Sequence, residues 1–143
     1  MSSKPSKVIV VDFGRDLFKS KAWVSLTGKA VQIYLLFLTK RRMTTIKHKG
    51  QKKRICENCH ELEFPYLEAK RYGISKRRFR LAIDQLILHG FLSVEETGGA
   101  YRRHKSKYAL IDNWRDFGTH KFQPGKARET DLVQRGYRRS EKR

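Results

Sequence analysis

The most informative side chains in this sequence form a cationic cluster that opens with one serine. Its members, taken as candidate contacts to nucleic acid, are Ser75, Lys76, Arg77, Arg78 and Arg80. An arginine can donate a pair of hydrogen bonds to guanine or to a phosphate group. A lysine at the start of a helix, where backbone N–H groups lack partners, suits a phosphate. The chemistry expected here is therefore binding of a polyanion.

Two further cationic clusters extend the same chemistry. Residues 40–54 hold eight Lys or Arg and no acid, without apolar periodicity, so we interpret them as a flexible basic loop or an extended hairpin. Their candidate phosphate contacts are Arg41, Arg42, Lys47, Lys49, Lys52, Lys53 and Arg54. The other cluster consists of Arg102, Arg103, His104 and Lys105. Phosphate contacts raise affinity without reading sequence, and arginine is favoured in narrow minor grooves. The competing interpretation of each cluster is a solvated surface.

The segment from Cys56 to His60 has the Cys-x-x-Cys-His spacing that is also found at haem attachment sites. Haem attachment requires export, and this sequence has no signal-peptide core. A structural zinc site needs four ligands; His48 could contribute, but His60 directly after Cys59 is poorly placed to share a metal. We therefore expect ordinary reduced thiols, no metal and no cofactor.

Net charge narrows the partner class further. The chain has 143 residues with 33 Lys or Arg against 14 Asp or Glu, a formal charge of +19. Such a charge repels itself and favours a polyanionic partner, of which nucleic acid is the commonest and anionic membrane the competitor. The longest apolar stretch, Ile33 to Leu38, has six residues, against the ~20 that span a bilayer. With no nucleophile motif or glycine-rich phosphate loop, we expect a cytoplasmic, nucleoid-associated protein that is not an enzyme and does not bind membrane.

A long core helix is predicted after Thr27, a residue type that caps helices. Its apolar residues recur at i, i+3, i+4, i+7 and i+8, and they are Ala30, Ile33, Tyr34, Phe37 and Leu38. Before it we expect an extended arm and a short helix at about 18–23.

The segment from 62 to 112 predicts a helix, a tight turn, a second helix and a strand hairpin. A short strand near 62–64 leads into a helix from Pro65 to Tyr72, which Gly73 ends. Ser75 caps the second helix, in which Phe79, Ala82, Ile83 and Leu86 share a face and His89-Gly90 marks the end. Strands are expected at 91–95 and 108–111.

The segment from Tyr72 to Leu92 resembles the winged helix-turn-helix signature of prokaryotic, phage and plasmid regulators and replication proteins. The likeness consists of the Gly73-Ile74-Ser75 turn, the apolar residues four, eight and eleven places after the serine, and Gly90-Phe91. It covers roughly residues 17–118 and implies a mainly α (α+β) winged helix with a long core helix, a two- to three-stranded wing hairpin and basic flexible termini. The domains are then an arm (1–16), the winged helix (17–118, with a basic insertion at 40–54) and a basic tail (119–143).

The resemblance implies binding of double-stranded DNA, with the second helix in the major groove, in transcription regulation or in plasmid or phage replication initiation. The alternative is a basic winged-helix protein that binds RNA or the ribosome. With the apolar face inward, Arg77, Leu81 and Asp84 point outward, and Asp84 is expected to neutralise Arg80. Leu81 and Leu88 predict either a homodimer interface or packing against the arm and tail of the same chain.

Overall fold

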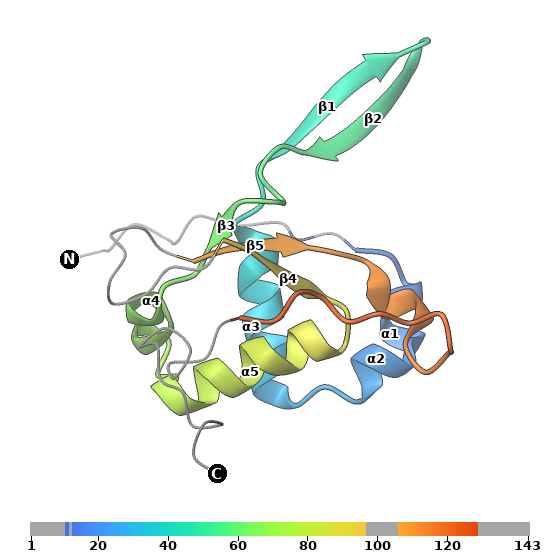
Figure 1. The fold of residues 1–143 in the computed structure, drawn as a ribbon. Helices are drawn as coiled ribbons and strands as arrows, with labels where there is room; N and C mark the ends of the chain where they lie inside the picture. Colours follow the sequence, from blue (N-terminus) through green and yellow to red (C-terminus); the bar gives the residue numbers. More distant parts are fainter. Residues whose placement is uncertain (1–10, 12, 97–105, 129–143) are drawn as a thin grey trace, which may run out of the picture.

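The computed structural model describes residues 11, 13–96 and 106–128 (Figure 1). Within them, five α-helices and two small antiparallel sheets give a mixed α/β fold. The helices are α1 (Asp16–Lys19), α2 (Lys21–Val24), α3 (Gly28–Thr39), α4 (Tyr66–Arg71), α5 (Lys76–Leu88) and the 3₁₀ helix η1 (Asn113–Asp116). The strands are β1 (Met43–His48), β2 (Gln51–Cys56), β3 (Leu62–Glu63), β4 (Leu92–Glu96) and β5 (Lys107–Leu110).

The helices α3 and α5 pack against each other at the centre of the fold (Figure 1). Each begins at the cap that the sequence predicts: Thr27 Oγ1 accepts a hydrogen bond from the Ala30 N–H at 3.3 Å, and Ser75 Oγ accepts one from the Arg78 N–H at 3.2 Å. Such caps satisfy N–H groups that have no partner within the helix. The apolar residues predicted to line both helices are all buried, so both core faces are confirmed.

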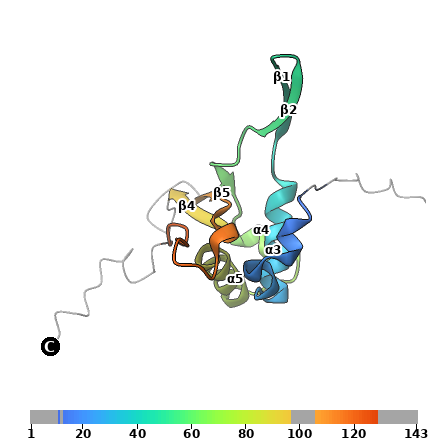
Figure 2. The same ribbon diagram turned by 90° about the vertical axis from the view of Figure 1, so that its right-hand side faces the viewer.

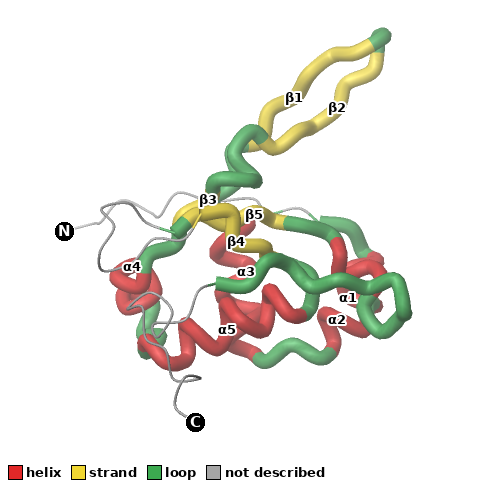
Figure 3. The backbone as a smooth tube through the Cα atoms, viewed as in Figure 1, coloured by secondary structure: helices red, strands yellow, loops and turns green. Residues whose placement is uncertain are grey.

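A three-stranded antiparallel sheet in the order β3-β5-β4 lies over these helices (Figure 3). Leu62 pairs with Tyr108 and Leu92 with Leu110. The strands predicted near 62–64, 91–95 and 108–111 are therefore confirmed. Alternate side chains of β4, Leu92 and Val94, are buried, as expected of a sheet with one face on a core.

The strands β1 and β2 form a separate hairpin that extends away from the rest of the fold in both views (Figures 1 and 2). Of the two interpretations of residues 40–54, the extended hairpin is the one formed. Its two-residue turn consists of Lys49 and Gly50, whose φ angles are 51° and 80°. Two successive positive φ values are those of a tight turn whose twist matches that of the strands it joins.

The region before α3 differs from its prediction. Two one-turn helices, α1 and α2, stand where a single helix at about 18–23 was expected. The break falls at Ser20, whose backbone is extended and whose Oγ accepts a hydrogen bond from the Trp23 N–H at 3.1 Å. A serine that caps a new helix in this way ends the preceding one.

Four aromatic side chains join elements that are distant in sequence. Tyr34 of α3 has its ring centroid 5.8 Å from that of Trp23 and 5.1 Å from that of Phe91. The ring of Phe91 in turn stacks on Trp114 of η1 at 5.9 Å. Burial raises the pKa of Tyr34 to about 12, because the phenolate is poorly solvated there. The region before α3 is thus fixed to the same core as α3, β4 and η1.

Residues 119–128, expected to be part of a tail, instead lie against α5 and β4. The Gly125 N–H donates to Ile87 O at 3.0 Å, and the Val94 N–H donates to Lys126 O at 2.9 Å. The Lys126 N–H donates to Ser93 Oγ, also at 2.9 Å. Backbone hydrogen bonds of this kind need no apolar periodicity, which is why the sequence pattern does not reveal them.

Candidate nucleic-acid interface

The turn between α4 and α5 fixes the direction in which α5 begins. Gly73, at φ 76°, ends α4 as predicted, and its N–H donates to Lys70 O at 3.0 Å. The next residue, Ile74, donates its N–H to Ala69 O at 3.2 Å and is only 1% exposed. The amino end of α5 is therefore anchored by a buried side chain directly before its cap.

The predicted contacts at the start of α5 are brought together on its first two turns. Lys76, Arg77 and Arg78 are exposed, and Arg80 is half-buried. Ser75 is exposed, but its hydroxyl oxygen is engaged as the helix cap. The exposed cations therefore lie at the end of the helix where N–H groups attract anions.

The outward stripe of α5 contains two leucines besides charged residues. Arg77, Leu81, Asp84 and Leu88 follow one another at intervals of three or four residues, as the sequence predicts for the face opposite the core. Leu81 is 56% exposed and Leu88 is 60% exposed, so the described part of the chain covers neither. The alternative in which the same chain buries them finds no support within those residues.

Asp84, the one acidic residue of α5, is paired with a residue that sequence reasoning missed. Arg128 donates from Nε to Asp84 Oδ1 at 2.7 Å and from Nη2 to Oδ2 at 2.9 Å. The sequence-based expectation gave Asp84 a role in neutralising Arg80 alone. Because the two partners of this fork are 44 positions apart, no helical spacing links them. The pair compensates the negative charge on the outward stripe.

The register of the hairpin divides the cations of residues 40–54 into separate groups. Lys47 lies opposite Lys52, and Arg54 lies opposite Thr45, so these three cations share one face. Lys53 lies opposite Ile46 on the other face. Lys49 stands in the turn between the strands.

Arg41 and Arg42, grouped with these cations in the sequence, belong to the base of the hairpin. Arg41 donates from Nε to Leu38 O at 3.2 Å. Arg42 Nε lies 3.7 Å from Glu57 Oε2. Both side chains therefore interact with the protein itself.

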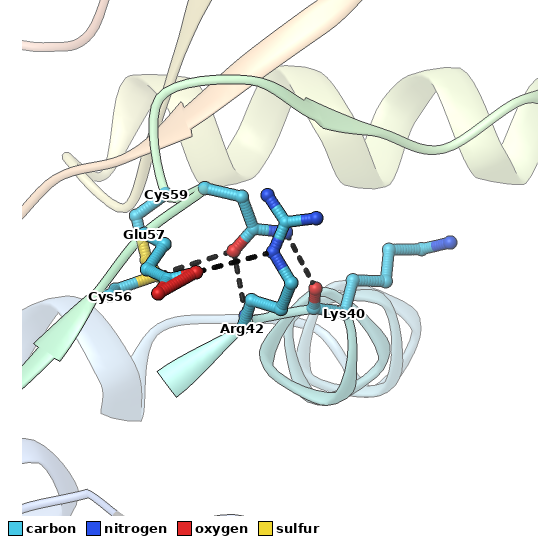
Figure 4. A network of polar contacts seen from close by, with 6 residues as sticks. Lys40, Arg42, Cys56, Glu57 and Cys59 are labelled. Atoms are coloured by element: carbon cyan, nitrogen blue, oxygen red, sulfur yellow. Dashed lines mark hydrogen bonds and ion pairs between the residues drawn. A yellow bond between two sulfur atoms is a disulfide. The ribbon is translucent and has the colours of Figure 1, made fainter. Parts of the chain in front are cut away.

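A short loop joins the hairpin to the three-stranded sheet (Figure 4). Asn58, which follows β2, bonds the segment that precedes β1. Its Oδ1 accepts from the Arg42 N–H at 2.7 Å, and its Nδ2 donates to Lys40 O at 3.0 Å. The Glu57 N–H donates to Arg42 O at 2.8 Å, and Cys59 O accepts from the Leu110 N–H at 2.9 Å. The hairpin is thus tied to both α3 and β5.

The two cysteines of this loop form a disulfide, so the expectation of reduced thiols is wrong. The intervening Glu57 and Asn58 turn the chain so that the two Cα atoms lie 5.7 Å apart, within disulfide range. A count of cysteines cannot reveal that proximity. Within the described ranges, this loop included, no three His, Cys, Asp or Glu side chains are grouped so that they could hold a metal ion.

The remaining predicted contacts are Arg102, Arg103, His104 and Lys105, which lie outside the described residues, between β4 and β5 in sequence. None of the helices in the described ranges has the length and apolar character needed to cross a bilayer. Comparison of this chain with protein-family models, with curated proteins and with solved structures finds no significant match.

Proposed function

We propose that this chain is a winged helix-turn-helix protein that binds double-stranded DNA, with α5 in the major groove. The fold supports this proposal through its order: a core helix, a short strand, a helix, a tight turn, a second helix and a strand pair, joined into one three-stranded sheet. A helix presented after such a turn can enter the major groove with its first residues toward the bases.

The observation that carries the proposal is the charge on α5. Its first two turns present Lys76, Arg77 and Arg78 to solvent, while its one acidic side chain is paired with Arg128. A carboxylate left unpaired on this face would repel phosphate groups, and that repulsion is compensated here. The net charge of +19 adds long-range attraction for the same polyanion.

Salt dependence tests this proposal directly. The affinity for a random-sequence duplex should fall steeply with salt, by ~0.9 log units per log unit of salt for each phosphate contacted. Fluorescence anisotropy with a labelled duplex at several salt concentrations measures that slope. An equal-length structured RNA serves as competitor, and its preferential binding would replace the DNA proposal with an RNA-binding one. A flat salt response would contradict both.

The pair between Asp84 and Arg128 gives a second prediction. Arg128→Gln should lower duplex affinity by about fivefold, because a lone carboxylate on the groove-facing surface costs ~1 kcal/mol. Adding Asp84→Asn should restore most of this affinity, since the repulsion is removed together with its partner. The same titration measures both variants, with Asp84→Asn alone as the control. If the double variant stays as weak as Arg128→Gln, Arg128 acts as a phosphate contact and not through Asp84.

A further inference from the structure

We propose that the tip of the β1–β2 hairpin binds the phosphates of a second duplex, so that one molecule bridges two DNA segments. This inference rests on the proposed function, in which α5 contacts the first segment. The hairpin tip is defined by Lys47, Lys49 and Lys52, whose side chains are all exposed.

The hairpin tip and α5 lie on opposite sides of the three-stranded sheet. In both views the ribbon extends upward from the sheet, while α5 lies below it (Figures 1 and 2). Six paired positions in each strand give the ribbon a length of about 20 Å, at roughly 3.3 Å per residue. DNA has a persistence length of ~50 nm, so a short duplex held by α5 is too stiff to bend around the molecule and reach the tip. A duplex at the tip is therefore a different segment from the one at α5.

The charge pattern of the tip favours an anionic partner. Lys47 and Lys52 are direct cross-strand partners, and Lys49 stands in the turn that joins their strands. Like charges directly opposite each other destabilise a strand pair. Residues 43–56 contain no Asp or Glu that could offset this repulsion within the ribbon. A phosphate close to both ammonium groups would offset it.

The composition of the hairpin favours duplex DNA among anionic partners. Residues 43–56 contain no Phe, Tyr or Trp. Protein interfaces are enriched in aromatic residues and depleted in lysine, and proteins that bind single strands stack aromatic side chains on the bases. A lysine-rich ribbon without aromatic residues instead suits the backbone of a duplex, where phosphate contacts need only charge. The major groove of B-DNA also admits a two-stranded ribbon.

The base of the hairpin ties the ribbon to the body that carries α5. Asn58 forms hydrogen bonds with the backbone of both Lys40 and Arg42, and the Cys56–Cys59 disulfide closes the loop beside it (Figure 4). The backbone of Cys59 also accepts a hydrogen bond from β5. The sheet that contains β5 contacts α5 through β4. The two proposed binding surfaces therefore belong to one body, as bridging requires.

A co-capture assay with the full chain tests this inference. A random-sequence duplex of about 30 base pairs, well below the ~150 base pairs of one persistence length, is immobilised on beads. The same duplex carrying a fluorophore is supplied in solution. Wild type should retain the fluorescent duplex on the beads. Retention should fall with salt more steeply than the binding of one duplex measured by anisotropy, because phosphate contacts at both surfaces contribute to it.

The tip variant combines Lys47→Gln, Lys49→Gln and Lys52→Gln. It should retain at least about tenfold less fluorescent duplex, while its affinity for a single duplex should fall by less than about threefold, because α5 is intact. Lys→Arg at the same three positions should keep retention at the wild-type level, since a phosphate contact needs the charge and not a particular cation.

The control variant has an equal loss of charge and combines Arg15→Gln, Lys19→Gln and Lys21→Gln. These residues are exposed and lie at or next to α1 and α2, away from the hairpin. The control should retain the fluorescent duplex as wild type does. Circular dichroism checks that every variant keeps the wild-type melting temperature.

The outcomes distinguish the two proposals. If the tip variant retains the second duplex as well as the control does, or if wild type binds one duplex and retains no second one, the bridging inference is overturned and the role of α5 stands. If wild type binds no duplex, or if the tip variant loses the binding of a single duplex altogether, the proposed function fails. Retention of a fluorescent structured RNA in place of the second duplex would also overturn the inference as stated.

Discussion

Gly90→Ala should lower the free energy of unfolding by about 3 kcal/mol or more. Gly90 has φ 86°, a left-handed conformation that costs an L side chain ~1–2 kcal/mol. A Cβ atom there would also lie 2.7 Å from the Trp114 backbone nitrogen and 2.9 Å from the Asn113 carbonyl carbon. Backbone atoms cannot move aside cheaply, so overpacking adds ~1–3 kcal/mol. Urea unfolding followed by circular dichroism measures the loss.

Gly73→Ala is the matched control, because Gly73 ends α4 much as Gly90 follows α5. Its φ is 76°, but a Cβ there meets nothing within 4 Å. Only the conformational cost remains, and the expected loss is ~1–2 kcal/mol. Equal losses for the two variants would mean that the contact of Gly90 with η1 contributes nothing, contrary to the packing described above.

Arg77→Lys should blur sequence preference while leaving general DNA affinity almost intact. Lysine keeps the charge but not the planar fork that donates two hydrogen bonds to guanine. Loss of one such contact costs ~1–3 kcal/mol of discrimination, or roughly 5- to 150-fold at the preferred site. Selection from random duplexes, followed by titration of the preferred and a scrambled site, measures both effects.

Arg77→Ala completes this comparison, since it removes the charge as well. It should reduce the salt slope by ~0.9, the value for one phosphate contact. Arg80→Ala, at the half-buried side of the helix, is expected to have the smaller effect on selected sequence. If wild type selects no consensus, α5 does not read bases. If Arg77→Lys keeps the same consensus, with the same ratio of affinities for the preferred and the scrambled site, Arg77 does not contact a base.

Local signals account for what the sequence could predict of this fold. Thr27 and Ser75 act on the N–H groups three residues ahead, and the apolar spacing after each sets the buried face of its helix. Gly73 and Gly90 end their elements through their own φ angles. Each of these effects is contained within a few residues, so it can be read from the chain.

The features that the sequence left open depend on contacts between distant residues. The hairpin has two exposed faces, so it lacks the apolar alternation that identifies a strand packed on a core. Asp84 and Arg128 meet only after residues 119–128 fold back. Within the candidate site, the cations at the start of α5 could be predicted, whereas the pair that compensates Asp84 could not.

The return of residues 119–128 also covers part of the exposed edge of the three-stranded sheet. In the sheet order β3-β5-β4, β4 is an edge strand, and an open edge is a template for pairing with another chain. The Val94 N–H on that edge donates a hydrogen bond to Lys126 O, and the Lys126 N–H donates one to Ser93 Oγ. A fragment that ended at 118 would uncover these groups and invite strand-to-strand aggregation. Residues 119–128 therefore protect the β4 edge from pairing with another chain. A shortened chain intended for crystallography or binding work needs to extend at least through Arg128.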